Sequence, residues 1–418
     1  MAKFIVKGHA KLSGKIEIAG NKNSVLPIMA AALLTDQISV LENVPNISDV
    51  AVMADLLAQC GVEIINLGNS KISINPSKLK KSDLPRELAE KLRASVVLIA
   101  PMVAKLGHIK MGYPGGDIIG RRPLDTHFQA LEALGAKIKK EEDYFEVTAS
   151  ALRGAEIFLE EASVTATENA IIAASVADGE TVIKRAASEP HIVDLCEFLI
   201  KMGAKIEGVG SNVLKITGVK TFYATTHFIR PDHIEAGTFA ILAAVTKSKL
   251  EMSPVIGEDL EMILLTLKKF GVDCKMDKNT LTVSATKLRA VEKVVTDVWP
   301  GFPTDLMAPM IVLATQAEGV TILHDWMYES RMFFVDKLLS MGAKVVIADP
   351  HRVFVYGPSS LHGQRLDTPD IRAGIALVIA ALAADGKSEI DKAELIERGY
   401  ENIVERLSTL GAKIQRVN

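Results

Sequence analysis

The 418-residue sequence has few cysteines, little net charge and no long apolar run. Its three cysteines, Cys60, Cys196 and Cys274, lie far apart and fit neither a metal motif nor a disulfide framework. The formal charge of −3 argues against general nucleic-acid binding, so any anion-binding site must be local. Apolar stretches such as 96–104 and 374–384 fall well short of the roughly 20 residues that a membrane span needs. We therefore expect no nucleic-acid partner and no membrane partner.

The first ten residues, MAKFIVKGHA, contain no apolar segment of the kind found in secretion signals. Reduced and mostly structural thiols are typical of the cytosol, so we expect a cytoplasmic protein. The length of the chain favours two or more domains with sizeable cores.

A short sequence pattern recurs six times along the chain. Apolar residues are followed by a glycine, a small or branched residue and an alternating, strand-like segment. A glycine in this place is typical of a helix C-terminus that turns into a strand through the left-handed conformation. Such regular spacing predicts six copies of one supersecondary unit. The six glycines, which follow one another at intervals of about 70 residues, are Gly61, Gly135, Gly203, Gly271, Gly342 and Gly411.

Each repeat also contains one Ala-rich, nearly uncharged segment and one amphipathic segment, joined by short strand-like segments. This order predicts a βαβαββ-like unit. No single unit could bury its apolar helix alone, so the units must cluster around these helices. The expected fold class is α/β (α+β in some schemes): a two-domain inside-out α/β barrel with three repeats per domain, helices inside and sheets outside. The six apolar segments are 24–35, 94–104, 168–178, 236–246, 306–317 and 373–385.

Polar residues stand at the fronts of these apolar helices. Asn23, Thr304 and Asp370 are of types that cap helix N-termini, and capping is the favoured interpretation for all three. A capping side chain accepts a backbone N–H, so these residues need no further role.

Cations at the same fronts need another explanation, because a positive charge at a helix N-terminus opposes the helix dipole. Lys22, Arg93 and Arg372 occupy such positions, and Arg331 and Arg398 recur near the starts of amphipathic helices. Several helix N-termini with surrounding cations form a strong anion site. The pattern predicts a substrate with several negative charges, such as phosphates and carboxylates.

The stretch GYPGGDIIGRRP, residues 112–123, combines several glycines with one carboxylate and two arginines. Glycine permits bending and close backbone approach, while Arg121 and Arg122 supply forked anion-binding groups. Asp117, between a pair of glycines and this pair of arginines, is an acid–base candidate on a mobile loop. The alternative for this stretch alone is a charged surface turn.

Five motifs are similar, in sequence and in order, to those of the UDP-N-acetylglucosamine 1-carboxyvinyltransferases, a family of enolpyruvyl transferases. They are AGNKNSVLP (19–27), GGDIIGRRPLDTH (115–127), FPTD (302–305), ESR (329–331) and RGY (398–400). The resemblance covers the whole chain. It implies transfer of the enolpyruvyl group of phosphoenolpyruvate to the 3-hydroxyl of UDP-N-acetylglucosamine with release of phosphate, the first committed step of peptidoglycan synthesis.

The resemblance also implies a domain arrangement and a set of partners. A discontinuous domain of residues 1–21 plus 231–418 and an inserted domain of residues 22–230 would flank a deep cleft. The inserted domain would carry the 112–123 loop as a lid. No metal ion and no cofactor is implied, and the two substrates are the expected partners of a monomer or weak oligomer.

Roles for individual residues follow from the same resemblance. Lys22, Arg122 and Arg398 would hold phosphoenolpyruvate, with Asn23 nearby. Asp305 would be the base on the sugar hydroxyl and Asp117 the general acid, so that Asp117, Lys22, Asp305 and Arg398 form the catalytic set. The remaining substrate-binding residues would be Arg93, Pro123, Leu124, Asp125, Thr126, Ser163, Val164, Met327, Arg331 and Asp370.

The sequence departs from the best-known family members at the loop carboxylate. Those members carry a cysteine at the position of Asp117, which the epoxide antibiotic fosfomycin alkylates, whereas other members carry aspartate. A carboxylate cannot form the thioether, so we expect insensitivity to fosfomycin. Because a carboxyl group is mostly ionised near pH 7 in water, Asp117 is expected to act as an acid only once the loop closes over bound ligands.

Two smaller departures concern the nucleotide. Thr165 stands where a glycine is common, and Glu161 where a cation would help to bind the diphosphate. These two residues leave room for an altered sugar-nucleotide preference.

Two alternative functions remain at this stage. A 3-phosphoshikimate enolpyruvyltransferase would share the fold, but it would carry a PGSKS-like start in place of AGNKNS. A non-catalytic, sugar-nucleotide-binding paralogue would be expected to lose at least one of Lys22, Arg122, Asp305 and Arg398, and all four are present.

Overall fold

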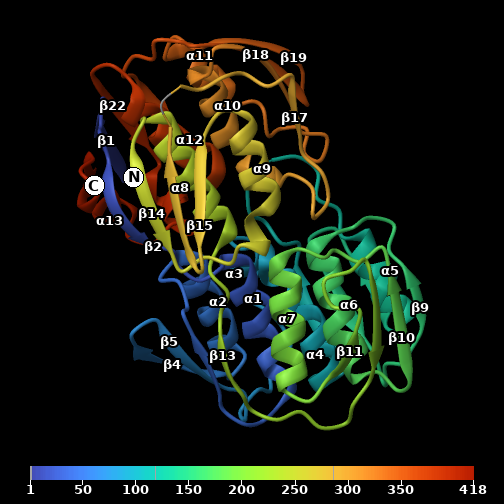
Figure 1. The fold of residues 1–418 in the computed structure, drawn as a ribbon. Helices are drawn as coiled ribbons and strands as arrows, with labels where there is room; N and C mark the ends of the chain where they lie inside the picture. Colours follow the sequence, from blue (N-terminus) through green and yellow to red (C-terminus); the bar gives the residue numbers. More distant parts are fainter. Residues whose placement is uncertain (1, 118, 286) are drawn as a thin grey trace. The chain divides into compact units, whose positions relative to one another are not determined.

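The computed structural model describes residues 2–117, 119–285 and 287–418. The chain divides into two compact units, and each is described by itself (Figure 1). Unit 1 comprises Met1–Ala19, Asp117–Arg121 and Pro231–Asn418, and unit 2 comprises Gly20–Gly116 and Arg122–Arg230. This division assigns the middle of the 112–123 loop to unit 1, whereas the predicted inserted domain holds the whole loop. The predicted domain boundaries stay a prediction.

Unit 1 is built around three apolar helices, α8 (His233–Val245), α10 (Met307–Gln316) and α12 (Ile371–Ala383), which contact one another. Every residue of α8 is buried, and α10 follows the 3-10 turn η4 (Thr304–Leu306). Amphipathic helices α9 (Glu261–Lys269), α11 (Val335–Ser340) and α13 (Ile403–Thr409) and two further turns, η3 (Glu258–Leu260) and η5 (Ala393–Arg398), complete the helical part.

Three four-stranded sheets cover the helices of unit 1. Their strand orders are β21-β22-β1-β23, β15-β16-β14-β2 and β17-β18-β20-β19. The bounds are β1 (Lys3–Lys7), β2 (Ser13–Glu17), β14 (Lys249–Ser253), β15 (Asp273–Asp277), β16 (Thr280–Ser284), β17 (Lys293–Val295), β18 (Gly319–His324), β19 (Lys344–Asp349), β20 (Arg352–Gly357), β21 (Arg365–Asp367), β22 (Lys387–Asp391) and β23 (Lys413–Val417).

Unit 2 repeats this plan around α1 (Lys22–Ala31), the pair η2 (Arg93–Leu98) and α4 (Ile99–Leu106), and α6 (Val164–Val176). The turn η2 contacts both α1 and α6. Amphipathic helices are α2 (Ser48–Gln59), α5 (Asp125–Ala133) and α7 (Pro190–Lys201), with the short η1 (Ala32–Leu34) and α3 (Arg86–Ala89).

The sheets of unit 2 have the orders β13-β3-β5-β4, β11-β12-β10-β9 and β6-β8-β7. In the three-stranded sheet, an isolated parallel bridge between Asp83 and Lys110 stands where the other sheets have a fourth strand. The bounds are β3 (Ser39–Glu42), β4 (Glu63–Gly68), β5 (Lys71–Asn75), β6 (His108–Gly112), β7 (Lys137–Lys140), β8 (Tyr144–Thr148), β9 (Glu156–Phe158), β10 (Glu180–Lys184), β11 (Lys205–Glu207), β12 (Val213–Thr217) and β13 (Thr226–Phe228).

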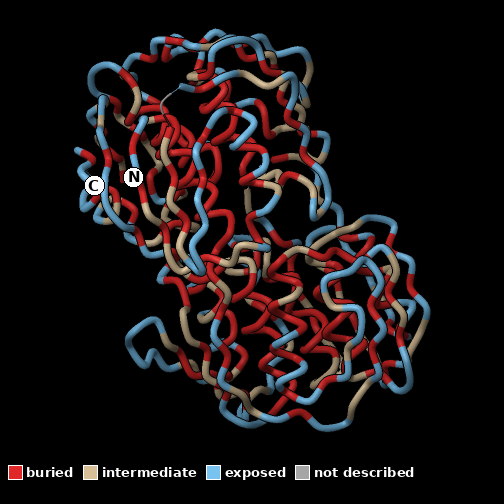
Figure 2. The backbone as a smooth tube through the Cα atoms, in the orientation of Figure 1, coloured by how far each residue is buried: buried red, intermediate tan, exposed pale blue. Residues whose placement is uncertain are grey.

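The predicted fold class is confirmed by the sheets that the described residues form, three in each unit, and by the buried helices beneath them. Strand β12, for example, alternates exposed and buried residues, so that one face of its sheet meets the core and the other meets water. Figure 2 shows the same contrast within each unit, with buried helices inside and exposed strands and loops outside.

The six repeat glycines adopt the backbone conformation that their spacing predicted. Their φ angles lie between +86° and +110°, at Gly61, Gly135, Gly203, Gly271, Gly342 and Gly411. A residue with a Cβ atom pays a steric cost in this region. Each glycine thus ends an amphipathic helix and lets the chain turn into the next strand.

Two carboxyl groups of unit 2 have raised pKa values, Glu168, which is buried in α6, and Glu189, which is partly buried just before α7. Burial raises the pKa of Glu189 to about 7. Burial, with the neighbouring charge of Glu189, raises the pKa of Glu168 well above its usual value. The interior therefore favours the protonated form of both groups.

Replacing Glu189 with glutamine is expected to stabilise the protein at pH 8 more than at pH 5. The ordinary pKa of this group is 4.5, so the folded state holds an extra proton between pH 4.5 and about 7. That stabilising contribution is complete below pH 4.5 and is lost as the pH rises through 7. The Glu189→Gln variant does not lose this stabilisation as the pH rises. We therefore expect its thermal unfolding midpoint at pH 8 to exceed that of the wild type by about 2–4 °C. Glu180→Gln, at an exposed position in β10, is the control, and equal shifts of Glu189→Gln at both pH values would contradict the expectation.

Candidate active site

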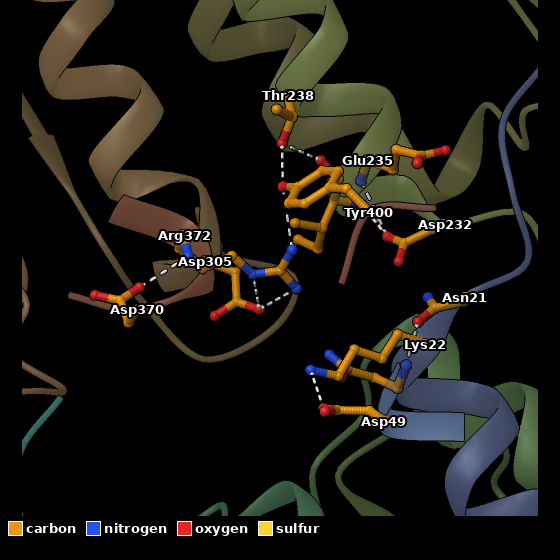
Figure 3. A network of polar contacts seen from close by, with 12 residues as sticks. Asn21, Lys22, Asp49, Asp232, Glu235, Thr238, Asp305, Asp370, Arg372 and Tyr400 are labelled. Atoms are coloured by element: carbon orange, nitrogen blue, oxygen red, sulfur yellow. Dashed lines mark hydrogen bonds and ion pairs between the residues drawn. The ribbon is translucent and has the colours of Figure 1, made fainter. Parts of the chain in front are cut away.

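Asp305, in η4, is the centre of a polar network in unit 1 (Figure 3). Arg331 donates from Nη2 to Asp305 Oδ1 at 3.2 Å, and Arg372 approaches Oδ2 with Nε at 3.0 Å and Nη2 at 2.7 Å. The two arginines are only 3% and 5% exposed, so each buried charge needs a partner. A carboxylate between two guanidinium groups is favoured in its ionised form, which is the form that a general base requires.

Arg372 is itself held by a second layer of hydrogen bonds. Its Nη1 donates to the hydroxyl of Tyr400 at 3.2 Å, and that hydroxyl lies 2.9 Å from Thr238 Oγ1 in α8. Burial raises the pKa of Tyr400 above its ordinary value, so the phenol keeps its proton. The sequence motif RGY supplied Arg398 as a candidate, but it gave no sign that Tyr400 fixes Arg372.

Asp325 plays a similar part for Arg331, whose Nε lies 4.0 Å from Asp325 Oδ2. This fully buried carboxylate also accepts from Thr304 Oγ1 at 2.5 Å and from the backbone N–H of Met327 at 3.0 Å. The prediction that Thr304 caps its helix is wrong, because its hydroxyl donates to Asp325 and not to the helix. Asp325 was not predicted, since a lone Asp after β18 carries no recognisable motif.

The loop carboxylate Asp117 pairs with Arg398 at 2.7 Å, and both side chains are less than one-fifth exposed. Two hydrogen bonds join the loop to the ESR segment: the backbone N–H of Arg121 donates to the side-chain Oε1 of Glu329 at 3.2 Å, and the N–H of Ser330 donates to the carbonyl of Ile119 at 3.1 Å. Ile118, in the same loop, lies outside the described residues. The two site candidates, Asp117 and Arg398, thus neutralise each other.

Asp370 caps α12, as expected, by accepting the N–H groups of Arg372 at 2.8 Å and Ala373 at 3.0 Å. Burial raises the pKa of Asp370, and the charge of Asp117 acts in the same direction. Unit 1 therefore brings together five predicted site residues: Asp117, Asp305, Arg331, Asp370 and Arg398.

In unit 2, Lys22 begins α1 and its ammonium lies 2.6 Å from Asp49 Oδ2 in α2. Both side chains are largely buried, so Asp49 compensates for a cation at a helix N-terminus. The expectation that Asn23 caps this helix is wrong, because the cap is Asn21, whose side chain accepts the N–H of Asn23 at 2.8 Å.

A cavity of about 380 Å³ lies within unit 2. It gathers part of the predicted nucleotide-binding set, Arg93 and residues 122–125, and it adds Tyr113, Phe128 and Lys140, which sequence reasoning missed. Arg93 shapes its wall by donating to the backbone oxygens of Arg122 at 2.5 Å and Pro114 at 3.4 Å. The lining residues are Arg93, Tyr113, Pro114, Arg122, Pro123, Leu124, Asp125, Phe128 and Lys140.

The other predicted residues of unit 2 lie outside this lining. Thr126 is buried in α5, and Ser163 precedes α6, where its Oγ accepts a long 3.4 Å bond from Ala166 N–H. Val164 is the first residue of α6. In unit 1, Met327 is held through its backbone by Asp325.

All three cysteines are buried and free. Burial raises the pKa of Cys60 to about 11, of Cys196 to about 12 and of Cys274 to about 11. A protonated, buried thiol is a poor nucleophile. None of the three can replace the loop carboxylate in chemistry.

Among residues 2–117, 119–285 and 287–418, no cluster of three or more His, Cys, Asp or Glu side chains is arranged to hold a metal ion. Within the same residues, no helix combines the length and the apolar character that crossing a membrane requires.

The chain is similar over nearly its whole length to known proteins. Residues 6–407 match the family model of EPSP synthase (3-phosphoshikimate 1-carboxyvinyltransferase). The UDP-N-acetylglucosamine 1-carboxyvinyltransferase of Treponema denticola is 47% identical, with 99% of each chain covered. That of Bradyrhizobium diazoefficiens is also 47% identical, over 99% of this chain and 98% of the relative.

Solved structures show the same fold at lower identity. The enolpyruvyl transferase NikO of Streptomyces tendae has a TM-score of 0.90 at 23% identity, covering 100% of this chain and 99% of that one. The EPSP synthase of Acinetobacter baumannii has a TM-score of 0.78 at 18% identity, with both chains fully covered.

Proposed function

The chain belongs to the EPSP synthase family, among the UDP-N-acetylglucosamine 1-carboxyvinyltransferases, and we propose that it transfers the enolpyruvyl group of phosphoenolpyruvate to the 3-hydroxyl of UDP-N-acetylglucosamine with release of phosphate. The observation that carries this proposal is the contact of the Asp305 carboxylate with two buried arginines, in the same unit as the Asp117–Arg398 pair. The relatives at 47% identity are named for this reaction, which disfavours the two alternative functions.

The reaction proceeds in two stages, addition and elimination. In the addition, Asp305 takes the proton of the sugar 3-hydroxyl, whose oxygen forms a bond to C2 of phosphoenolpyruvate while Asp117 protonates C3. In the elimination, C3 returns a proton and the bond from C2 to the phosphate oxygen breaks, which leaves the enolpyruvyl ether and phosphate. Cationic side chains stabilise the negative charge on phosphate and carboxylate.

We assign Lys22, Arg122 and Arg398 to phosphoenolpyruvate, with Asn23 close by. Because Arg398 is neutralised by Asp117 in the structure, the anionic substrate must take over this arginine, and Asp117 is then released beside the substrate. A carboxylate that has lost its cation and is covered by the loop becomes easier to protonate. In this proposal Asp117 takes up a proton from solvent after the substrate has displaced it from Arg398, and then passes that proton to C3.

The nucleotide is assigned to the cavity of unit 2 and to the neighbouring residues Ser163 and Val164, while Met327, Arg331 and Asp370 complete the substrate-binding set. We further propose that the protein works in the cytoplasm, as a monomer or weak oligomer, without metal or cofactor. Its product would enter peptidoglycan synthesis.

The experiment that tests the function is phosphate release from phosphoenolpyruvate with three acceptor conditions. We expect release with UDP-N-acetylglucosamine and none with shikimate 3-phosphate or without acceptor. Release only with shikimate 3-phosphate would support the first alternative. Absence of release in all three would support the non-catalytic one.

Lys140 supplies a further cation to the nucleotide cavity, and its replacement by alanine is expected to weaken nucleotide binding. Its ammonium lies 3.1 Å from Asp125 Oδ1 and 4.7 Å from the centre of the Phe128 ring. We expect Lys140→Ala to raise the KM for UDP-N-acetylglucosamine about three- to tenfold, with a smaller effect at high salt and no change in the KM for phosphoenolpyruvate. Inhibition by UDP should weaken more than inhibition by uridine.

The matched control is Lys139→Ala. Successive residues of β7 point to opposite faces, and Lys139 pairs with Glu141 at 3.0 Å away from the cavity lining. Equal effects of the two substitutions would contradict a specific role of Lys140.

A further inference from the structure

A buried chain of hydrogen bonds crosses unit 2 through residues that the proposed reaction does not use. Its centre is His127 in α5, which is 1% exposed, and Asn169 in α6, which is fully buried. His127 Nε2 lies 3.0 Å from Thr165 Oγ1, and His127 Nδ1 lies 3.0 Å from Asn169 Nδ2. Asn169 continues the chain to the backbone of Val96 in η2 and Ala100 in α4.

The backbone groups at one end determine the proton positions of Asn169 and His127. The N–H of Ala100 can only donate, at 3.0 Å, so the atom of Asn169 that faces it must be the carbonyl oxygen. The carbonyl of Val96 can only accept, at 2.9 Å, so the atom that faces it is the amide nitrogen. This same nitrogen donates to His127 Nδ1, which must be unprotonated. His127 therefore carries its single proton on Nε2 and donates it to Thr165 Oγ1.

The charge of the ring agrees with this pattern. Burial and, second, the positive charge of Arg93 lower the pKa of His127 to about 3. If Nδ1 were also protonated, two hydrogen-bond donors, Nδ1–H of His127 and the amide N–H of Asn169, would face each other. The imidazole is therefore neutral, with Nδ1 as an acceptor and Nε2–H as a donor.

Each anchor of this chain lies next to a segment assigned to the nucleotide. Val96 is in the same η2 turn that begins with Arg93, whose guanidinium holds the cavity wall. His127 follows residues 122–125, which line the cavity. Thr165 follows Ser163 and Val164 at the start of α6. Three segments distant in sequence are therefore joined by one uncharged chain.

We propose that His127, Asn169 and Thr165 are positioning residues for nucleotide binding, a role that rests on the proposed function. Directional hydrogen bonds to the buried His127 and Asn169 define one arrangement of their partners, because each unsatisfied buried group would cost free energy. The hydroxyl of Thr165 accepts the proton of His127 Nε2 at 3.0 Å and so completes the chain.

The test begins with Thr165→Val, which keeps the shape but removes the acceptor of the Nε2 proton. We expect the Kd and the KM for UDP-N-acetylglucosamine to rise about five- to tenfold and the KM for phosphoenolpyruvate to stay within about twofold. Thr165→Ser should restore the wild-type values. The matched control is Ser175→Ala in the same helix, since the Ser175 hydroxyl donates to Ile171 O within α6.

A spectroscopic readout tests the proton positions without any turnover. The ¹⁵N resonances of His127 should report a neutral, Nε2-protonated ring from pH 5 to pH 9. In Asn169→Asp the carboxylate can only accept, so the signal should change to an Nδ1-protonated ring or to imidazolium. A wild-type ring that titrates in this range, or an unchanged signal in Asn169→Asp, would overturn the assignment.

The outcomes also separate this proposal from the proposed function. Thr165→Val with unchanged nucleotide binding, or with equal increases of both KM values, would overturn the positioning role in an enzyme that remains active. A wild-type protein that neither binds UDP-N-acetylglucosamine nor releases phosphate would overturn the function and the positioning role together.

Discussion

Asp117→Asn is expected to lower kcat by about 10²–10⁴-fold while phosphoenolpyruvate binds as well as before or more tightly. Asparagine has nearly the shape of aspartate but cannot carry the proton to C3. It also removes the negative charge that neutralises Arg398 at 2.7 Å, so the substrate no longer competes with a loop carboxylate for this arginine. The measurement is steady-state kinetics for kcat, together with the Kd for phosphoenolpyruvate in the presence of UDP-N-acetylglucosamine.

Glu329→Gln provides the control for loss of a carboxylate beside the same loop. Its side-chain oxygen accepts the backbone N–H of Arg121 at 3.2 Å, and glutamine can keep that bond. We expect its kcat to change by less than about threefold, since a neutral acceptor replaces a charged one at an exposed position. Turnover of Asp117→Asn close to that of the wild type would remove Asp117 from the role of acid.

Asp117→Cys is expected to convert a fosfomycin-insensitive protein into one that the epoxide inactivates covalently. In the wild type, the three thiols are buried with raised pKa values, so no cysteine offers a reactive thiolate. At position 117 a thiol would face the guanidinium of Arg398, and a neighbouring cation favours the thiolate form. Attack on the epoxide would then form a thioether, detected as a mass increase of one inhibitor per chain with loss of residual activity.

A cysteine elsewhere should not react in this way. Asp143→Cys, at an exposed position in unit 2, is the control for accessibility alone, and it should stay active under the drug. Covalent inactivation of the wild type at low drug concentration would contradict the assignment of Asp117 to the family's reactive loop position.

The repeats and the fold class were predictable because they depend on local patterns. Each of the six glycines needs a positive φ at the end of a helix, and each apolar segment needs burial on all sides, so sequence spacing carries this information. The three-stranded sheet was not foreseen. In place of a fourth strand, that sheet has a single isolated β-bridge between Asp83 and Lys110. One residue is too short to show the alternation of apolar and polar residues by which a strand is predicted.

The site was predictable only where a motif or a lone charge marked it. Asn21 and Asn23 are equally suitable N-cap residues, so the sequence does not distinguish between them. In the structure Asn21 has the extended backbone of an N-cap residue, and its side chain accepts the N–H of Asn23. Asp325, Tyr400 and Lys140 gain their meaning from partners far along the chain, which no local pattern encodes. The roles of Asp117, Asp305 and the cations stay predictions, supported by their ion pairs.

Transfer of an intact enolpyruvyl group to the sugar can be followed in a single NMR time course. Phosphoenolpyruvate and UDP-N-acetylglucosamine are mixed with the purified protein, and ³¹P and ¹H spectra are recorded together. We expect inorganic phosphate and a new pair of vinyl protons on the sugar ether to appear at equal rates and in equal amounts. Phosphate without the vinyl ether, or no change in either spectrum, would contradict it.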